Sequence, residues 1–132
     1  MIKNIYNLGD AALYCDFGNT VNKETNLKVI NYFNDIRKKN ITGIKNIAPS
    51  YNKLIIYFDL ELTNYKKVKD TIENLDISTF EAAKTKIVKI PVCFDDEFAL
   101  DLERVEKRSG LVKKEIVNQL ISQKYFCYMT GF

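Results

Sequence analysis

Four short stretches of the first sixty residues have the pattern of β-strands. Residues 2–8 alternate loosely between apolar and polar side chains, and residues 11–17 alternate with a period of two. The stretches predicted to be strands are 2–8, 11–17, 44–49 and 53–59. Gly9-Asp10 lies between the first two, where a glycine next to an aspartate favours a tight hairpin turn. The pattern therefore predicts two pairs of strands, of which the first pair is a hairpin.

Two further stretches, 23–38 and 64–75, repeat their apolar residues every three to four positions, as amphipathic helices do. Asn22 is a plausible N-cap for the first helix, and Thr63 or Asn64 for the second. The predicted core consists of Leu13, Phe17, Leu27, Ile30, Phe33, Leu54, Ile56, Val68 and Ile72. On this prediction, truncating Phe33 to alanine costs about 3–5 kcal/mol of stability.

The order strand, strand, helix, strand, strand, helix favours an α+β fold of the ferredoxin-like sandwich type. Such a fold has an antiparallel sheet with both helices on one face. We assign residues 1–82 to this domain.

A second pattern begins near residue 83 and continues to residue 132. Val88 to Phe94 alternate as a strand, and Pro91 restricts that strand to an edge because proline has no N–H to donate. Two short helices are predicted next, the first capped by Asp101 and ended by Ser109-Gly110, the second around 116–121. Residues 124–130 are aromatic-rich and are predicted to form a strand.

Composition excludes several kinds of chemistry. The chain contains no histidine, which excludes Ser-His-Asp and Cys-His catalysis and removes the commonest metal ligand. Its three cysteines are widely spaced and form no C-x-x-C motif, so reduced thiols in a cytoplasmic protein are expected, with Cys93 and Cys127 as buried neighbours. The net charge of +3 and lysine pairs without interleaved aromatics predict no nucleic-acid partner, and no apolar run predicts a membrane span.

Three groups of residues have both a functional and a structural interpretation. Asp10 either shapes a functional loop or completes a hairpin turn. The acidic cluster around Asp95 and Glu97 either binds a cation or holds a general base, or it is a solvated loop before the next helix. The aromatic residues either line a ligand or partner site or pack in a core. These aromatic residues are Tyr125, Phe126, Tyr128 and Phe132.

Four segments in the same order resemble the family of the 5-oxoprolinase B subunit, which includes the kinase inhibitor KipI and the allophanate hydrolase subunit 1 domain. They are Gly9 to Leu13 with Asp16-Phe17-Gly18, Ile47 to Tyr51 with Leu54 to Asp59, Ile90 to Phe94 with Glu97-Phe98 and Asp101-Leu102, and Gly110-Leu111 with Tyr125 and Tyr128 to Phe132. Together they cover nearly the whole chain.

The resemblance implies that the ferredoxin-like domain is followed by the start of a cyclophilin-like β-barrel. It implies a hydrolase subunit that acts with a companion cyclophilin-like subunit to convert 5-oxoproline to glutamate. ATP and Mg²⁺ would then be cofactors of the whole complex. The alternative is an inhibitor of a sensor histidine kinase. The candidate ligand- or partner-binding residues are Asp10, Tyr51, Asp95, Glu97, Tyr128, Gly131 and Phe132.

The chain departs from the family pattern in two ways. The sequence stops at Gly131-Phe132, where the family continues through most of the barrel, and Leu120 stands where the family usually has a histidine. An aromatic strand without neighbours has an unpaired edge that favours association. We therefore expect the isolated chain to self-associate or to need its companion, and not to cleave 5-oxoproline alone.

Overall fold

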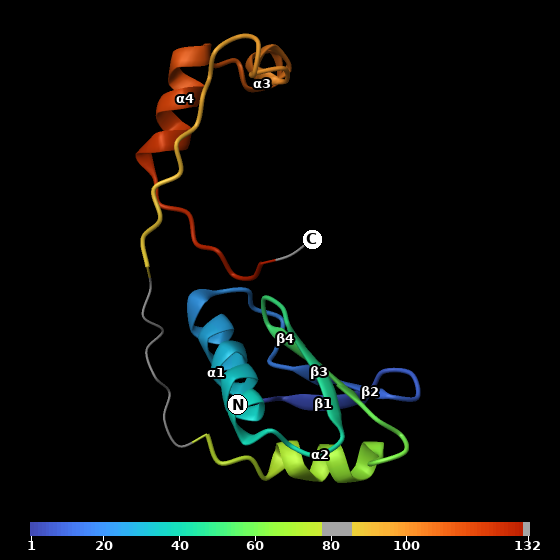
Figure 1. Cartoon of the computed structure of the whole chain (residues 1–132). Helices are drawn as coiled ribbons and strands as arrows, with labels where there is room; N and C mark the ends of the chain where they lie inside the picture. The colour runs from blue at the N-terminus through green and yellow to red at the C-terminus, as the bar shows by residue number, and fades with distance from the viewer. Residues whose placement is uncertain (78–85, 131–132) are drawn as a thin grey trace. The chain divides into compact units, whose positions relative to one another are not determined.

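A computed structural model of the chain describes residues 1–77 and 86–130 (Figure 1). It contains a four-stranded antiparallel sheet and four helices in these residues, which confirms the predicted α+β class. The chain divides into two compact units. The first is drawn from residues 1–84 and 127–132, and the second from residues 85–126. The predicted domain boundary at residue 82 lies outside the described residues.

The sheet belongs to the first unit and has the strand order β1-β2-β4-β3. Its strands are β1 (Asn4–Asn7), β2 (Ala12–Asp16), β3 (Ile44–Pro49) and β4 (Lys53–Phe58). Every neighbouring pair is antiparallel, so β2 and β3 run parallel to each other with β4 between them. The helix between β2 and β3 makes this a split β-α-β arrangement, as in ferredoxin-like folds.

Two helices cover one face of this sheet, as the sequence predicted. They are α1 (Lys23–Lys39) and α2 (Tyr65–Glu73). Each begins at an asparagine whose side chain accepts a backbone N–H, Asn22 from Thr25 at 2.8 Å and Asn64 from Lys67 at 3.0 Å. These bonds satisfy N–H groups that have no partner inside a helix, which fixes where each helix starts.

The core lies between the sheet and these two helices. Its buried side chains are Leu13, Cys15, Phe17, Val29, Tyr32, Ile36, Leu54, Ile56, Phe58, Val68 and Ile72. The core predicted on α1 was wrong at Leu27, Ile30 and Phe33, which are only partly buried. The sheet-facing stripe of α1 instead passes through Val29, Tyr32 and Ile36, at spacings of three and four.

The second unit contains two short helices, α3 (Leu102–Ser109) and α4 (Lys113–Ser122). Gly110 ends α3 in the left-handed conformation at φ 72°, as predicted. Asp101 is the N-cap residue of α3, as predicted, although its side chain makes no capping hydrogen bond. The predicted strands at 88–94 and 124–130 are also absent from the described residues. A strand forms only where a neighbour accepts its backbone hydrogen bonds, and these described residues provide none.

The cysteines differ from the prediction. Cys93 and Cys127 are both exposed, so neither is a buried thiol. Cys15 is the fully buried one, and burial raises its thiol pKa to about 12. Because only a thiolate is a good nucleophile, Cys15 is a packing residue. Among the described residues, no helix has the length and apolarity needed to cross a bilayer.

Candidate functional site

Residues 127–130 return to the first unit and contact the start of α1 and the turn between β3 and β4. We call the contact formed by Asn26, Ser50, Tyr51, Tyr128 and Met129 the junction. It unites two of the predicted site residues, Tyr51 and Tyr128, which are 77 positions apart in the printed sequence. The junction is therefore the candidate functional site.

The Asn26 side chain is the centre of the junction. It is only 3% exposed, although asparagine is usually a surface residue. Its Nδ2 group donates to the backbone carbonyls of Ser50 at 3.2 Å, Tyr51 at 3.0 Å and Tyr128 at 3.1 Å. Two N–H hydrogens thus serve three carbonyls, which requires one of them to be shared.

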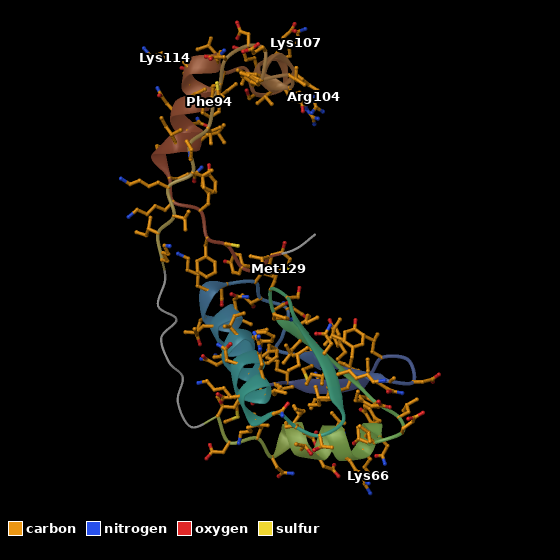
Figure 2. The ribbon with its side chains drawn as sticks, in the orientation of Figure 1. Lys66, Phe94, Arg104, Lys107, Lys114 and Met129 are labelled. Carbon is orange, nitrogen blue, oxygen red and sulfur yellow. The ribbon has the colours of Figure 1, made fainter. Side chains whose placement is uncertain are left out.

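Two side-chain contacts complete the junction. The rings of Tyr51 and Tyr128 have their centroids 5.7 Å apart at 59°, within the range of favourable aromatic pairs. Ser50 Oγ lies 3.6 Å from Met129 Sδ. Figure 2 labels Met129 near the end of the strands that this turn connects. Tyr51 remains about half exposed, so its ring also presents a surface to an outside partner.

A second set of bonds holds the β3–β4 turn in place. Asn52 Nδ2 and Lys53 Nζ each donate to the Gly18 carbonyl at 2.7 Å. Gly18 has φ 114°, and a Cβ there would meet Lys3 Nζ at 2.9 Å. The Lys3 side chain is flexible and could move aside, so it is the positive φ, which strains any residue with a Cβ, that favours glycine here.

The carboxylate of Asp16 belongs to the same set of bonds. It accepts from the Lys53 ammonium and, at 2.7 Å, from the Gly18 N–H. These two bonds, with that from Lys53 the stronger, lower the Asp16 pKa below its ordinary value of 3.8. Both bonds stabilise the charged form, because a carboxylate accepts more strongly than a carboxylic acid.

We expect the Asp16 charge to stabilise the first unit in a pH-dependent way. A lowered folded-state pKa gives stability that is fully present above the unfolded value and is lost as pH falls through the folded value. The Asp16→Asn variant should therefore lose about 1 kcal/mol at pH 7, and this difference from the parent should shrink below about pH 4. Urea unfolding between pH 3 and 7 measures it, with Lys53→Met as the partner variant. A difference that grows in acid would contradict the assignment.

The remaining predicted site residues lie elsewhere. Asp10 is exposed in the turn between β1 and β2. Asp95 and Glu97 are exposed in the second unit, where the Asp95 carbonyl accepts the N–H groups of Phe98 and Ala99 at 2.9 and 3.0 Å. Gly131 and Phe132 lie outside the described residues. Of the predicted site residues that the structure describes, only Tyr51 and Tyr128 are brought together.

The acidic residues Asp95 to Glu97 are exposed. The acidic loop forms an ion pair between Asp96 Oδ1 and Lys113 Nζ, and this pair lowers the Asp96 pKa. No cluster of three histidine, cysteine, aspartate or glutamate side chains that could hold a metal occurs in residues 1–77 and 86–130. The five junction side chains include no carboxylate, ammonium or thiol. The junction can therefore hold chain segments together and present an aromatic surface, which is the chemistry of a binding region.

The sequence did not predict the role of Asn26, whose side chain donates the hydrogen bonds that connect the junction segments. The available signal was its position three residues before Val29, on the sheet-facing side of a helix. In a chain rich in asparagine, the residue type alone does not distinguish this position.

Comparison with known proteins gives matches over nearly the whole chain. The family described as carboxyltransferase domain, subdomain C and D, matches residues 3–132. The 5-oxoprolinase B subunit of Bacillus subtilis (strain 168) is 28% identical over 140 aligned positions, which include 97% of this chain. The chain spans 58% of that relative's length.

Two solved structures share the fold. Protein PH0987 from Pyrococcus horikoshii is 25% identical, with a TM-score of 0.54 over 91% of this chain and 56% of its own. TTHA0988 in space group P212121 is 24% identical, with a TM-score of 0.66 over 83% of this chain and 21% of its own. These matches confirm the resemblance noted in the sequence.

Proposed function

This chain belongs to the family of carboxyltransferase domains, subdomain C and D, and on that premise we propose that it contributes to the B subunit of an ATP-dependent 5-oxoprolinase. The observation that carries the proposal is the similarity to the Bacillus subtilis 5-oxoprolinase B subunit along 97% of this chain. In the proposed reaction, water adds to the lactam carbonyl of 5-oxoproline and the ring C–N bond breaks, giving glutamate. Hydrolysis of ATP drives this step.

The proposed role of this chain is assembly. The chain has no histidine to act as a general base, and the described residues offer no metal-binding cluster. We propose that ATP and Mg²⁺ act as cofactors of the whole complex, which includes a cyclophilin-like companion subunit. The second unit has a surface suited to such a partner, which we call the exposed segment, residues 86–94.

The exposed segment is unusually apolar for a surface. Ile87, Val88, Ile90 and Val92 are 60–77% exposed. β-Branched residues in an extended stretch favour pairing with another strand, because pairing covers both their side chains and their backbone groups. We propose that a companion subunit supplies that strand.

The test combines the purified chain with 5-oxoproline, ATP and Mg²⁺, with and without the companion subunits, and measures glutamate and ADP. Glutamate should form only when the companions are present. The double variant Ile90→Gln and Val92→Gln should lose most of the activity by losing the companion, whereas Lys89→Gln should retain it. Glutamate made by a monomeric chain alone would overturn the assembly role.

A second candidate function is inhibition of a sensor histidine kinase by protein contact. It is favoured by the half-exposed Tyr51 at the junction, which a protein partner could contact. The same preparations distinguish the two functions. Inhibition of kinase autophosphorylation, without glutamate formation in any mixture, would select the inhibitor.

A further inference from the structure

A hollow of about 360 Å³ lies in the first unit, between the end of α1 and strand β3, away from the junction residues. Phe33, Ile41 and Ile44 form an apolar floor that packs on the core. Arg37 and Lys45 contribute cations to the lining. The volume is at the lower end of the range for small-molecule pockets, about 300–1,000 Å³.

The charges around the hollow are positive. Arg37 begins a run of three cations in the last turn of α1, followed by Lys38 and Lys39. Lys45 is held by Asp59 at 3.0 Å, whereas no carboxylate of the described residues forms an ion pair with Arg37. The carbonyl end of α1 contributes about half a negative charge, which the three cations exceed. The Arg37 guanidinium is therefore available to bind an anion and lies beside the apolar floor of the hollow.

The adjoining sheet edge is closed to an extended peptide. The Ser50 N–H donates to the Lys53 carbonyl. With the observed register, this bond means that the even-numbered residues of β3 form the backbone hydrogen bonds to β4. Ile47 and Pro49 therefore face the free edge. The Ile47 N–H is already bonded to Asn46 Oδ1 at 2.9 Å, and Pro49 has no N–H. A bulge between Ile44 and Asn46 further disrupts the edge.

We propose that this hollow binds a small amphipathic carboxylate. Its alkyl or aryl body lies on Phe33, Ile41 and Ile44, and its carboxylate is bonded by Arg37. Arginine suits this role because its planar fork matches a carboxylate. Because the N–H donors of this edge are missing or already bonded, strand addition is disfavoured and side chains are expected to select the ligand. The proposal is independent of the 5-oxoprolinase proposal.

Amide NMR of the whole chain with octanoate as the probe tests the proposal. Saturable shifts should be confined to amides lining the hollow, such as Asn40, Ile41 and Asn46. Arg37→Met keeps an apolar stem and should weaken binding about five- to tenfold. Lys38→Met removes a neighbouring cation of the same helix turn that does not line the hollow, and should change binding less than about twofold.

Two comparisons make the result decisive. Octyltrimethylammonium has the same chain with the opposite charge and should not produce the shifts. Acetyl-leucyl-isoleucine has an apolar body and a carboxylate at a peptide C-terminus. Tighter binding of this dipeptide would identify a peptide terminus as the ligand, and tighter binding of octanoate would identify a free fatty acid. Equal binding of the cation, or unchanged octanoate binding in an Arg37→Met variant whose spectrum is that of a folded protein, would overturn the proposal.

Discussion

Replacing Ile56 with alanine is expected to lower the free energy of unfolding of the first unit by about 2–5 kcal/mol. Ile56 is fully buried in a central strand, where it pairs with Leu13 on one side and Ile47 on the other. The loss combines the removed apolar surface with the cavity left behind, since neighbours in a packed core relax only in part. Urea unfolding followed by circular dichroism measures the change.

Two further variants serve as controls for the Ile56→Ala measurement. Ile55→Ala changes the adjacent residue on the opposite, partly exposed face and should cost about 1 kcal/mol or less. Phe33→Ala should cost about 1–2 kcal/mol, and not the 3–5 kcal/mol expected from sequence, because Phe33 lines the hollow and is only partly buried. A larger loss for Phe33 than for Ile56 would contradict the observed rotation of α1.

Replacing Asn26 with leucine is expected to destabilise the first unit by about 2–4 kcal/mol. The substitution keeps the side-chain size but removes the group that donates to the carbonyls of Ser50, Tyr51 and Tyr128 at the junction. These carbonyls are partly buried, and leaving them unpaired adds a desolvation cost to the loss of the bonds themselves. Urea unfolding gives the total, and hydrogen exchange at Tyr128 and Met129 reports whether residues 127–130 have detached.

Asn31 supplies a matched control on the same helix. It is 7% exposed, and its Nδ2 group has no hydrogen-bond partner among the described residues. Asn31→Leu should therefore leave stability unchanged or raise it, because it removes a buried donor without leaving an acceptor unpaired. Equal losses in the two leucine variants would mean that leucine is merely too bulky for this helix and that the junction bonds contribute little.

The N-terminal elements could be predicted from sequence because their signals are local. The strand predicted at 44–49 matches the observed ends of β3. Asn22 caps the first helix as predicted, and Asn64, one of two predicted caps, begins the second. A capping asparagine acts on an N–H only three residues away, so no knowledge of the rest of the fold is needed.

Local signals do not determine which face of α1 packs on the sheet. Apolar side chains surround much of this helix, and Leu27, Ile30 and Phe33 form as good a stripe as Val29, Tyr32 and Ile36. The sheet selects the second stripe, and that selection is a tertiary effect. The strand predicted at 88–94 was wrong for a related reason. Alternation there indicates that the segment can pair with another strand, but it does not show that a partner strand is present.

The candidate site was predicted in part. Tyr51 and Tyr128 were named from motifs in different parts of the chain, but no sequence pattern says that they meet. Their meeting depends on Asn26, whose role is visible only when three carbonyls from two segments surround it. Hydrogen bonds between residues far apart in the chain produce no periodic pattern in a sequence, so the pattern does not predict them.

The junction also has a consequence for how the protein is made. Asn26 and Tyr128 are 102 residues apart, whereas the sheet and both helices that cover it are complete by Glu73. At a synthesis rate of about 5–20 residues per second, the ribosome delivers Tyr128 roughly 5–20 s after Asn26. The sheet can thus fold against α1 and α2 while Asn26 holds only Ser50 and Tyr51. Asn26 Nδ2 then receives its third acceptor, the Tyr128 carbonyl, only after the whole second unit has emerged.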